Sequence, residues 1–294
     1  MSQLSLSQVS SDFTAPPIDR DVRAAEPKRL PPLHLMYWLL IISANTIGET
    51  LGDLISMTLN VGYAWSTIIL MAMFVIAVIA AVWTKVQHQW LYWTVIILSS
   101  TAGTTLSDLV NRNILGTPEN PAYGGGVLGI AFSLVLLFVA WKVIAPKRGI
   151  HAPLSRTSEL LYWLCIATSS TLGTAFGDYL THVTLPGQTH EVGFGPATAI
   201  LFAAFVAVAL LSRTARVSRA FLYWSAIVVT HPLGATAGDF LTKDKEEGGV
   251  ELGTVWATII LVAIFLLLSA IAYFVQRYKS RTESPAFESP TLEP

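Results

Sequence analysis

Five acidic residues stand inside long apolar runs of the chain, where an ionised side chain costs roughly 2.5–3.5 kcal/mol on membrane-insertion scales. They are Glu49, Asp53, Asp108, Asp178 and Asp239. Asn45, Glu49 and Asp53 are spaced four residues apart, so on a helix they form one polar stripe. Carboxylate, amide and hydroxyl oxygens are the ligands that Mg²⁺, Ca²⁺ and Mn²⁺ prefer. The pattern therefore predicts a binding site for a divalent cation.

The residue four positions after each aspartate shares its helix face, so it predicts how that aspartate is neutralised. Asp108 with Arg112 and Asp239 with Lys243 are expected to form structural ion pairs. Asp53 has no base at this spacing, and it is therefore expected to remain free to bind a cation.

Asp178 is followed at the same spacing by His182, and a carboxylate beside an imidazole suits a metal-ligand pair or a proton relay. A histidine ligand, either His182 or His231, would shift the selectivity of the site toward Mn²⁺ or another transition metal. The cation is expected to be a substrate and not a permanently bound cofactor. The predicted metal ligands are Glu49, Asp53, Asp178, His182 and Asn45.

The aspartates belong to an internal repeat. Each follows a Tyr-Trp pair and a glycine at fixed distances, with the glycine 11 residues after the tyrosine and the aspartate five residues after the glycine. The tyrosines are Tyr37, Tyr92, Tyr162 and Tyr223, and the glycines are Gly48, Gly103, Gly173 and Gly234. Four matches at the same spacing predict four tandem copies of one helical hairpin.

The elements that position these residues are predicted to be transmembrane helices. The chain has 294 residues, of which only 13% are charged, against about 25% in soluble domains. A bilayer core about 30 Å thick needs about 20 apolar helical residues. Eight windows of the sequence satisfy this requirement, at about 34–57, 62–84, 89–111, 124–145, 159–182, 194–212, 220–242 and 252–276.

We therefore expect an all-α, polytopic membrane domain over residues 34–276. Its four hairpins are expected at about 34–84, 89–145, 159–212 and 220–276. Residues 1–33 and 277–294 contain too few apolar side chains to offset the entropy of ordering, so both are predicted to be disordered tails.

The basic residues predict the orientation in the membrane. The two terminal segments and the connections after spans two, four and six hold 15 of the 18 Lys and Arg residues. Only Arg112, Lys243 and Lys245 fall on the opposite side. The positive-inside rule then places both termini in the cytoplasm of a multi-pass plasma membrane protein, which in a bacterium means the inner membrane.

Small residues predict how the helices pack. Pairs of small residues four apart allow helix backbones to approach closely, so the odd-numbered spans are expected to form an inner bundle inside the more apolar even-numbered spans. The glycines concerned are Gly48, Gly52, Gly103, Gly173, Gly177, Gly234 and Gly238. The Tyr-Trp pairs are expected to anchor the spans at the lipid headgroup boundary.

Composition and motifs exclude several functions. A net charge of −1 provides no basic field for nucleic acid. The only cysteine, Cys165, excludes an intrachain disulfide framework and a multi-cysteine metal site. The sequence contains no phosphate-binding loop, HExxH motif or Ser/His/Asp constellation, so no catalytic residue and no enzymatic activity are predicted. The lipid bilayer and a metal cation, together with protons, are the expected partners, and the oligomeric state is left open.

The run GETLGDLISMTLNVGYAWST at 48–67 recurs in shorter form as GTTLSD at 103–108, GTAFGD at 173–178 and HPLGATAGDFLTK at 231–243. With these motifs, residues 34–276 resemble a family of uncharacterised bacterial integral membrane proteins built from the same fourfold hairpin. The resemblance implies the fold and carries no established activity.

A looser resemblance is to the manganese and calcium exchangers of Golgi and thylakoid membranes, which use paired Glu-x-Gly-Asp motifs followed by a base. Here two residues instead of one separate Glu49 from Gly52, Leu54 replaces the base, and the glutamate occurs in one repeat only. This resemblance implies a cation as substrate.

Three functions are considered on this basis. The first is a membrane transporter for the efflux or exchange of a divalent metal such as Mn²⁺, with the acidic site between the odd-numbered helices. The alternatives are a scaffold or sensor that transports nothing, and a proton-coupled carrier of a small organic solute. The Gly-Asp steps also resemble intramembrane aspartyl proteases, but the accompanying Tyr-Asp and Pro-Ala-Leu elements are missing.

Overall fold

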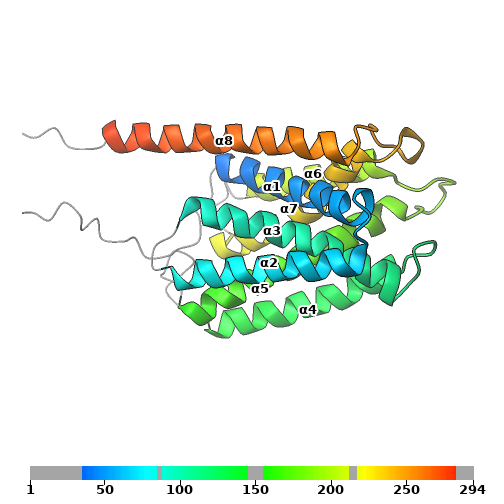
Figure 1. Cartoon of the computed structure of the whole chain (residues 1–294), viewed down its shortest axis with the longest axis horizontal. Helices are drawn as coiled ribbons and strands as arrows, with labels where there is room; N and C mark the ends of the chain where they lie inside the picture. The colour runs from blue at the N-terminus through cyan, green and yellow to red at the C-terminus, as the bar shows by residue number, and fades with distance from the viewer. Residues whose placement is uncertain (1–34, 85–87, 145–154, 212–216, 283–294) are drawn as a thin grey trace, which may run out of the picture.

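The structure is a computed structural model that describes residues 35–84, 88–144, 155–211 and 217–282. Within these ranges the chain forms eight α-helices and no β-strand, so the all-α prediction is confirmed (Figure 1). The helices are α1 (Leu35–Asp53), α2 (Tyr63–Trp83), α3 (Gln89–Asp108), α4 (Tyr123–Ile144), α5 (Arg156–His182), α6 (Phe194–Leu211), α7 (Arg219–Thr242) and α8 (Thr254–Thr282). Helix α8 continues past the predicted start of the C-terminal tail at residue 277, and the rest of both predicted tails lies outside the described residues.

The odd-numbered helices form a closed inner ring. Helix α1 packs on α3, α3 on α5, α5 on α7, and α7 packs back on α1. Each even-numbered helix covers this ring from outside and packs on the odd-numbered helix of the next repeat: α2 on α3, α4 on α5, α6 on α7 and α8 on α1. The predicted inner and outer arrangement is therefore confirmed, and the four hairpins interlock because each outer helix lies on its neighbour's inner helix.

At each of the four contacts in the inner ring, the first glycine of one repeat lies against the backbone of the next inner helix. A Cβ atom placed on Gly48, Gly103, Gly173 or Gly234 would lie 2.9 Å from a backbone atom of the next inner helix. The backbone atoms belong to Ser100, Thr171, Pro232 and Asn45, respectively. Since backbone cannot move aside as a flexible side chain can, no side chain larger than hydrogen fits there, and these glycines lie where two inner helices approach most closely.

The second glycines of the repeats also pack against the next inner helix. A Cβ atom would meet Thr104 at 2.9 Å from Gly52, Thr236 at 3.1 Å from Gly177 and Glu49 at 2.8 Å from Gly238. These neighbours are side chains, so the second contact is less strict than the first. The contact of Gly238 nevertheless places Glu49 of α1 against α7.

The four repeat tyrosines meet at the beginning of the inner helices, which must therefore all run in the same direction. Their hydroxyl groups form a closed cycle of hydrogen bonds, with oxygen distances of 3.0 Å (Tyr37–Tyr92), 3.2 Å (Tyr92–Tyr162), 2.9 Å (Tyr162–Tyr223) and 3.3 Å (Tyr37–Tyr223). All four side chains are buried. The tyrosine side chains face one another inside the ring and not the surroundings, as an anchor at the headgroup boundary would, because the repeat supplies each buried hydroxyl with partners from the two neighbouring copies.

An apolar layer follows the tyrosine cycle along the ring. One helical turn after each tyrosine stands an isoleucine that is at most 1% exposed: Ile41, Ile96, Ile166 and Ile227. Beyond it, the residues at the same spacing become polar, beginning with Asn45, Ser100, Ser170 and His231. The interior of the ring is therefore apolar toward the start of the inner helices and polar toward their end.

The outer helices present apolar side chains to the surroundings. Large apolar residues on α4, including Leu128, Phe132 and Val135, are more than half exposed, and α2, α6 and α8 carry similar surfaces. Of the helices in the described ranges, five are long and apolar enough to cross a membrane: α2, α4, α5, α6 and α8. Exposed apolar area of this extent suits contact with lipid, so the fold supports residence in a membrane.

The glycine contacts predict a clear difference between two conservative substitutions. Gly173→Ala should destabilise the protein by about 1–3 kcal/mol, because the added methyl group overpacks the contact with α7. Gly129→Ala on α4 is the matched control, since no atom lies within 4 Å of its added Cβ and the change should be neutral or slightly stabilising. Thermal unfolding of the detergent-purified chain measures both, and a Gly173→Ala melting temperature equal to that of the wild type would contradict the packing argument.

The tyrosine cycle predicts that one hydroxyl group matters for stability. Tyr223→Phe removes a group that hydrogen-bonds to two other tyrosines, and it should lower the free energy of unfolding by about 1–3 kcal/mol because buried partners lose their bonds. Tyr179→Phe makes the same chemical change at an exposed side chain and should leave the melting temperature unchanged. Equal melting temperatures for the two variants would show that the cycle contributes nothing to stability.

Candidate functional site

Glu49 is the only glutamate on the polar stripes of the inner ring, and it is buried. Its Oε2 atom accepts a hydrogen bond from the hydroxyl of Thr104 on α3 at 2.9 Å and another from Thr174 on α5 at 3.0 Å. The two hydroxyl oxygens are 3.3 Å apart. The corresponding positions of three repeats therefore meet, which shows that the polar stripes of α1, α3 and α5 face the interior of the ring.

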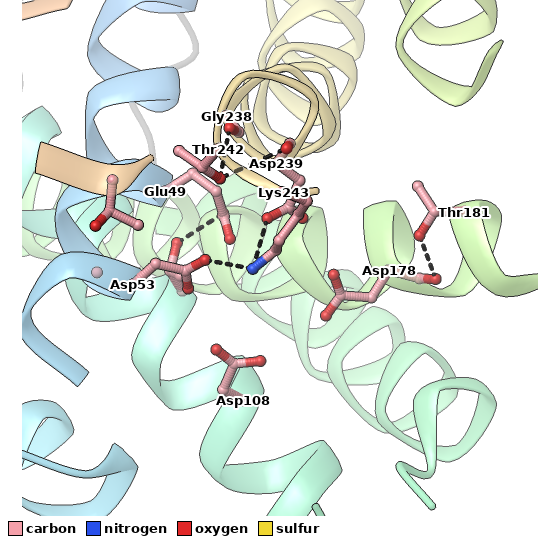
Figure 2. A network of polar contacts seen from close by, with 12 residues as sticks. Glu49, Asp53, Asp108, Asp178, Thr181, Gly238, Asp239, Thr242 and Lys243 are labelled. Carbon is pink, nitrogen blue, oxygen red and sulfur yellow. Dashed lines mark hydrogen bonds and ion pairs between the residues drawn. The ribbon is translucent and has the colours of Figure 1, made fainter. Parts of the chain in front are cut away.

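One turn further along the inner helices, a lysine lies between two aspartates. The ammonium of Lys243 is 2.6 Å from Asp53 Oδ2 and 3.2 Å from Asp239 Oδ1, and Figure 2 shows it between the two carboxylates. Among the residues that the structure describes, Glu49, Asp53 and Asp239 each place a carboxylate oxygen within 4.8 Å of the other two. We call these three residues the acidic group.

The predicted local ion pairs are both present. Arg112 Nε donates to Asp108 Oδ1 at 3.0 Å, and Lys243 pairs with Asp239. Asp53 has no base four residues further along its own helix, but it is not free, because Lys243 reaches it from α7 at an even shorter distance. The four-residue spacing considers one helix only, whereas this contact depends on the packing of α7 against α1.

Asp178 and His182 do not form the predicted carboxylate and imidazole pair. The Nδ1 atom of His182 lies 2.8 Å from the backbone carbonyl oxygen of Asp178, and its ring stacks on Tyr123 with the centroids 4.9 Å apart. The carboxylate of Asp178 points toward the acidic group and away from Thr181 (Figure 2). Its buried Oδ2 atom has no hydrogen-bond partner among the described residues.

Asn45 lies one turn before Glu49 and is 1% exposed. Neither its amide nitrogen nor its amide oxygen has a hydrogen-bond partner within the described part of the chain. His231 occupies the same layer, and its Nδ1 atom has other partners than Asn45. It lies 2.9 Å from the carbonyl oxygen of Ile227 and 3.2 Å from the hydroxyl of Ser169. A buried amide without partners is uncommon and calls for a ligand or water.

The polar end of the ring carries more acids than bases. Five buried carboxylates, those of Glu49 and the four repeat aspartates, face the two basic side chains of Arg112 and Lys243. Lys243 lies just past the end of α7. Burial alone would lower the pKa of its ammonium, but the neighbouring carboxylates of Asp239 and Asp53 outweigh burial and hold the pKa well above the usual value. Lys243 is therefore charged, and it offsets only part of the excess negative charge.

The inner helices end differently in the two halves of the chain. After Asp53 and Asp108 the backbone continues as π-helices, at Leu54–Thr58 and Leu109–Ile114, whereas α5 and α7 continue as α-helices to His182 and Thr242. A π-helix has a wider turn, so it rotates the residues that follow away from the α-helical stripe. Met57 and Arg112 therefore lie at another angle around the helix axis than His182 and Lys243. All four nevertheless occupy the same position in the repeat.

Sequence reasoning brought together only part of this site. Glu49 and Asp53 lie together as predicted, whereas Asp178, His182 and Asn45 are outside the acidic group, and Asp239 belongs to it. The spacing predicts only a structural pair for Asp239 and Lys243, and it does not place Asp239 in the acidic group or Lys243 beside Asp53. The repeat pattern contains one indication that Asp239 lies near Asp53. Four similar inner helices that each pack on the next can close into a ring, and a closed ring places α7 beside α1.

The fold and the site define the chain as an all-α protein of four tandem helical hairpins, with apolar outer helices suited to a membrane and a buried acidic group inside. Four consecutive segments, residues 36–87, 91–145, 161–217 and 222–278, match the family described as Repeat of Unknown Function (DUF347). The matches cover most of the chain, which therefore belongs to this family, and each corresponds to one hairpin. No curated protein and no solved structure is significantly similar to the chain.

The site predicts opposite effects of two isosteric substitutions on stability. Asp53→Asn should lower the melting temperature, because it leaves the buried Lys243 with one fewer carboxylate, and breaking such a pair costs up to about 3–5 kcal/mol. Asp178→Asn should leave the melting temperature unchanged or raise it, because it removes a buried charge whose Oδ2 has no partner. Thermal unfolding of both variants in one detergent tests this, and an equal loss for Asp178→Asn would mean that its carboxylate is paired in the folded protein.

Proposed function

We propose that the chain is an integral membrane transporter that binds a divalent cation at the acidic group and carries it across the membrane by efflux or exchange. The carboxylate oxygens of Glu49, Asp53 and Asp239, within 4.8 Å of one another, carry this proposal. Hard divalent cations bind oxygen ligands at about 2.0–2.6 Å, so two ligands of one ion are separated by at most about 5 Å. The threonines that hold Glu49 also orient the carboxylate toward the interior of the ring.

The unpaired polar groups beside the acidic group support a ligand in the interior. Asp178 Oδ2 and the amide of Asn45 are buried without hydrogen-bond partners in the described structure. Both contain oxygen atoms of the kind that Mn²⁺, Mg²⁺ or Ca²⁺ accept. Mn²⁺ is the substrate that we propose, and a proton is the proposed coupling ion, because carboxylates can take up a proton when the metal leaves.

The polarity of the ring supports access to the site from one side at a time. The tyrosine cycle and the isoleucine layer separate the acidic group from the start of the inner helices. The two bases at the opposite end are partly exposed, Arg112 by 20% and Lys243 by 22%. In this conformation a cation would therefore enter at the end that carries the bases, and transport would require the tyrosine and isoleucine layers to open.

We further propose eight transmembrane helices in a bacterial inner membrane, with both termini in the cytoplasm. Helices α1, α3 and α7 carry the polar stripe and are less apolar than the five helices that suit a membrane by composition. The outer helices cover them, so they need not face lipid themselves. Under the positive-inside rule the tyrosine end then faces the cytoplasm and the acidic group faces the outer side.

A scaffold or sensor that transports nothing is the second candidate. The ion pairs of Lys243 with Asp53 and of Arg112 with Asp108 favour it, since both bases have partners inside the protein. In a scaffold these pairs would serve only the stability of the fold, and the acidic group would have no role as a binding site. The two candidates therefore differ in whether Glu49, which forms no ion pair within the described part of the chain, affects ion movement.

Transport of Mn²⁺ into sealed proteoliposomes that contain a Mn²⁺-quenched dye tests the proposal. The wild type should quench the dye, and Glu49→Gln should slow quenching at least about tenfold, because a neutral amide is a much weaker ligand than a carboxylate. Glu119→Gln is the matched control, since it makes the same change on an exposed loop and should leave the rate unchanged. A wild-type rate no higher than that of Glu49→Gln, with both proteins eluting as the same species in size-exclusion chromatography, would reject transport and leave the scaffold.

A further inference from the structure

Lys243 is positioned where a bound cation would be. Its ammonium contacts Asp53 Oδ2 and Asp239 Oδ1, which belong to two of the three residues in the acidic group. A metal ion coordinated by the same oxygens and an ammonium a few ångströms away would repel each other strongly in a poorly solvated interior. The side chain and a metal ion therefore compete for the same oxygens.

Polar groups around the acidic group remain without hydrogen-bond partners when the Lys243 ammonium is in place. Lys243 leaves Asp178 Oδ2 without a partner, and the amide of Asn45 is also unpaired among the described residues. Figure 2 shows the Asp178 carboxylate directed toward the acidic group. The interior thus offers more oxygen ligands than one ammonium uses, whereas a divalent cation takes about six to eight.

The position of Lys243 at the end of α7 allows its side chain to leave while its backbone stays fixed. Its backbone N–H donates to the carbonyl of Asp239 at 2.8 Å, and its own carbonyl accepts from the N–H of Glu251 at 3.0 Å. The side chain is 22% exposed, against 4% for Asp53 and 6% for Asp239, so its flexible stem lies at the open side of the site. Rotation of the side chain alone could therefore carry the ammonium out to solvent.

Among the residues that the structure describes, the fourth repeat alone supplies a base to the acidic group. At the corresponding positions, Met57 carries no charge, Arg112 pairs with Asp108, and His182 stacks on Tyr123. The fourth repeat therefore differs from the others by a base that crosses to another helix. That difference is not explained by assembly of the ring, which uses the same glycine contact in every copy.

We propose that Lys243 is a tethered counter-cation, which occupies the cation site when no metal is bound and is displaced by the incoming divalent ion. This inference rests on the proposed function, because it assumes that the acidic group binds a metal. Lys243 then sets the affinity of the site, since every binding event must first remove the ammonium. It also prevents the acidic group from remaining uncompensated after the metal has left.

Mn²⁺ binding to the purified full-length protein tests the inference, with free Mn²⁺ measured by electron paramagnetic resonance. Lys243→Met should tighten Mn²⁺ binding at least about tenfold, because the competing ammonium is gone while the carboxylates remain. Lys245→Met is the matched control, since the Lys245 side chain is 77% exposed and its ammonium pairs with Glu251, outside the acidic group, so the affinity should not change. Unchanged or weaker binding by Lys243→Met, with binding by the wild type, would overturn the inference and leave the cation site intact.

Two further outcomes separate the inference from the proposed function. If neither the wild type nor Lys243→Met binds Mn²⁺ although both elute as the same folded species, the acidic group is not a metal site and the proposed function fails. If Lys243→Met does not fold, the wild type alone decides, through acetylation of lysines by acetic anhydride and mass spectrometry. Mn²⁺ should increase the acetylation of Lys243 several-fold and leave that of Lys245 unchanged, and an unchanged or lower acetylation of Lys243 would overturn the inference.

Discussion

The close approach of the inner helices at four glycines is the contact on which the rest of the structure depends. In lipid, apolar side chains gain little by leaving one apolar environment for another, so helices associate mainly through van der Waals contact and hydrogen bonds. Gly48, Gly103, Gly173 and Gly234 provide such contact, because each lies directly against the backbone of the next inner helix. The glycine of each inner helix packs on the next inner helix, and the glycine of the previous one packs on it. The four contacts therefore close into a ring in which every helix contacts the next in the same way. Everything that faces the interior follows from this closure.

Closure of the ring explains why its two ends differ. At one end every repeat contributes a tyrosine, and four identical hydroxyl groups satisfy one another in a cycle. At the other end every repeat contributes an aspartate, and four ionised carboxylates repel one another. That end is stabilised by residues that differ between the repeats: Arg112, Lys243, and the threonines that donate to Glu49. The chemistry of the site therefore arises from the differences between the copies, and the fold arises from what they share.

The contrast between features that all four repeats share and residues that differ between them also explains how much the sequence could predict. The repeat, the all-α hairpins, the glycine contacts and the pair of Asp108 with Arg112 depend on residues within one helix or on features present in every copy, and these were predicted. The pairing of Lys243 with Asp53 was missed because it joins residues 190 positions apart in sequence. The tyrosines were assigned to the membrane boundary because a single copy does not reveal that four hydroxyl groups will meet. His182 shares a helix face with Asp178, but the backbone carbonyl and the ring of Tyr123 hold its imidazole away from the carboxylate.

Buried charge of this kind is poor evidence for a structural role. Replacing buried ion pairs with apolar side chains of similar volume is often neutral or stabilising, because the cost of desolvation offsets the attraction. The glycine contacts and the tyrosine cycle together hold the inner ring along the helices without any charged residue. The carboxylates of Glu49, Asp53 and Asp239 take no part in the tyrosine cycle or in the contacts at the four first glycines, and Lys243 compensates only part of their negative charge. Under the proposed function, a base that neutralises only part of this negative charge would let the site take up a cation and release it again.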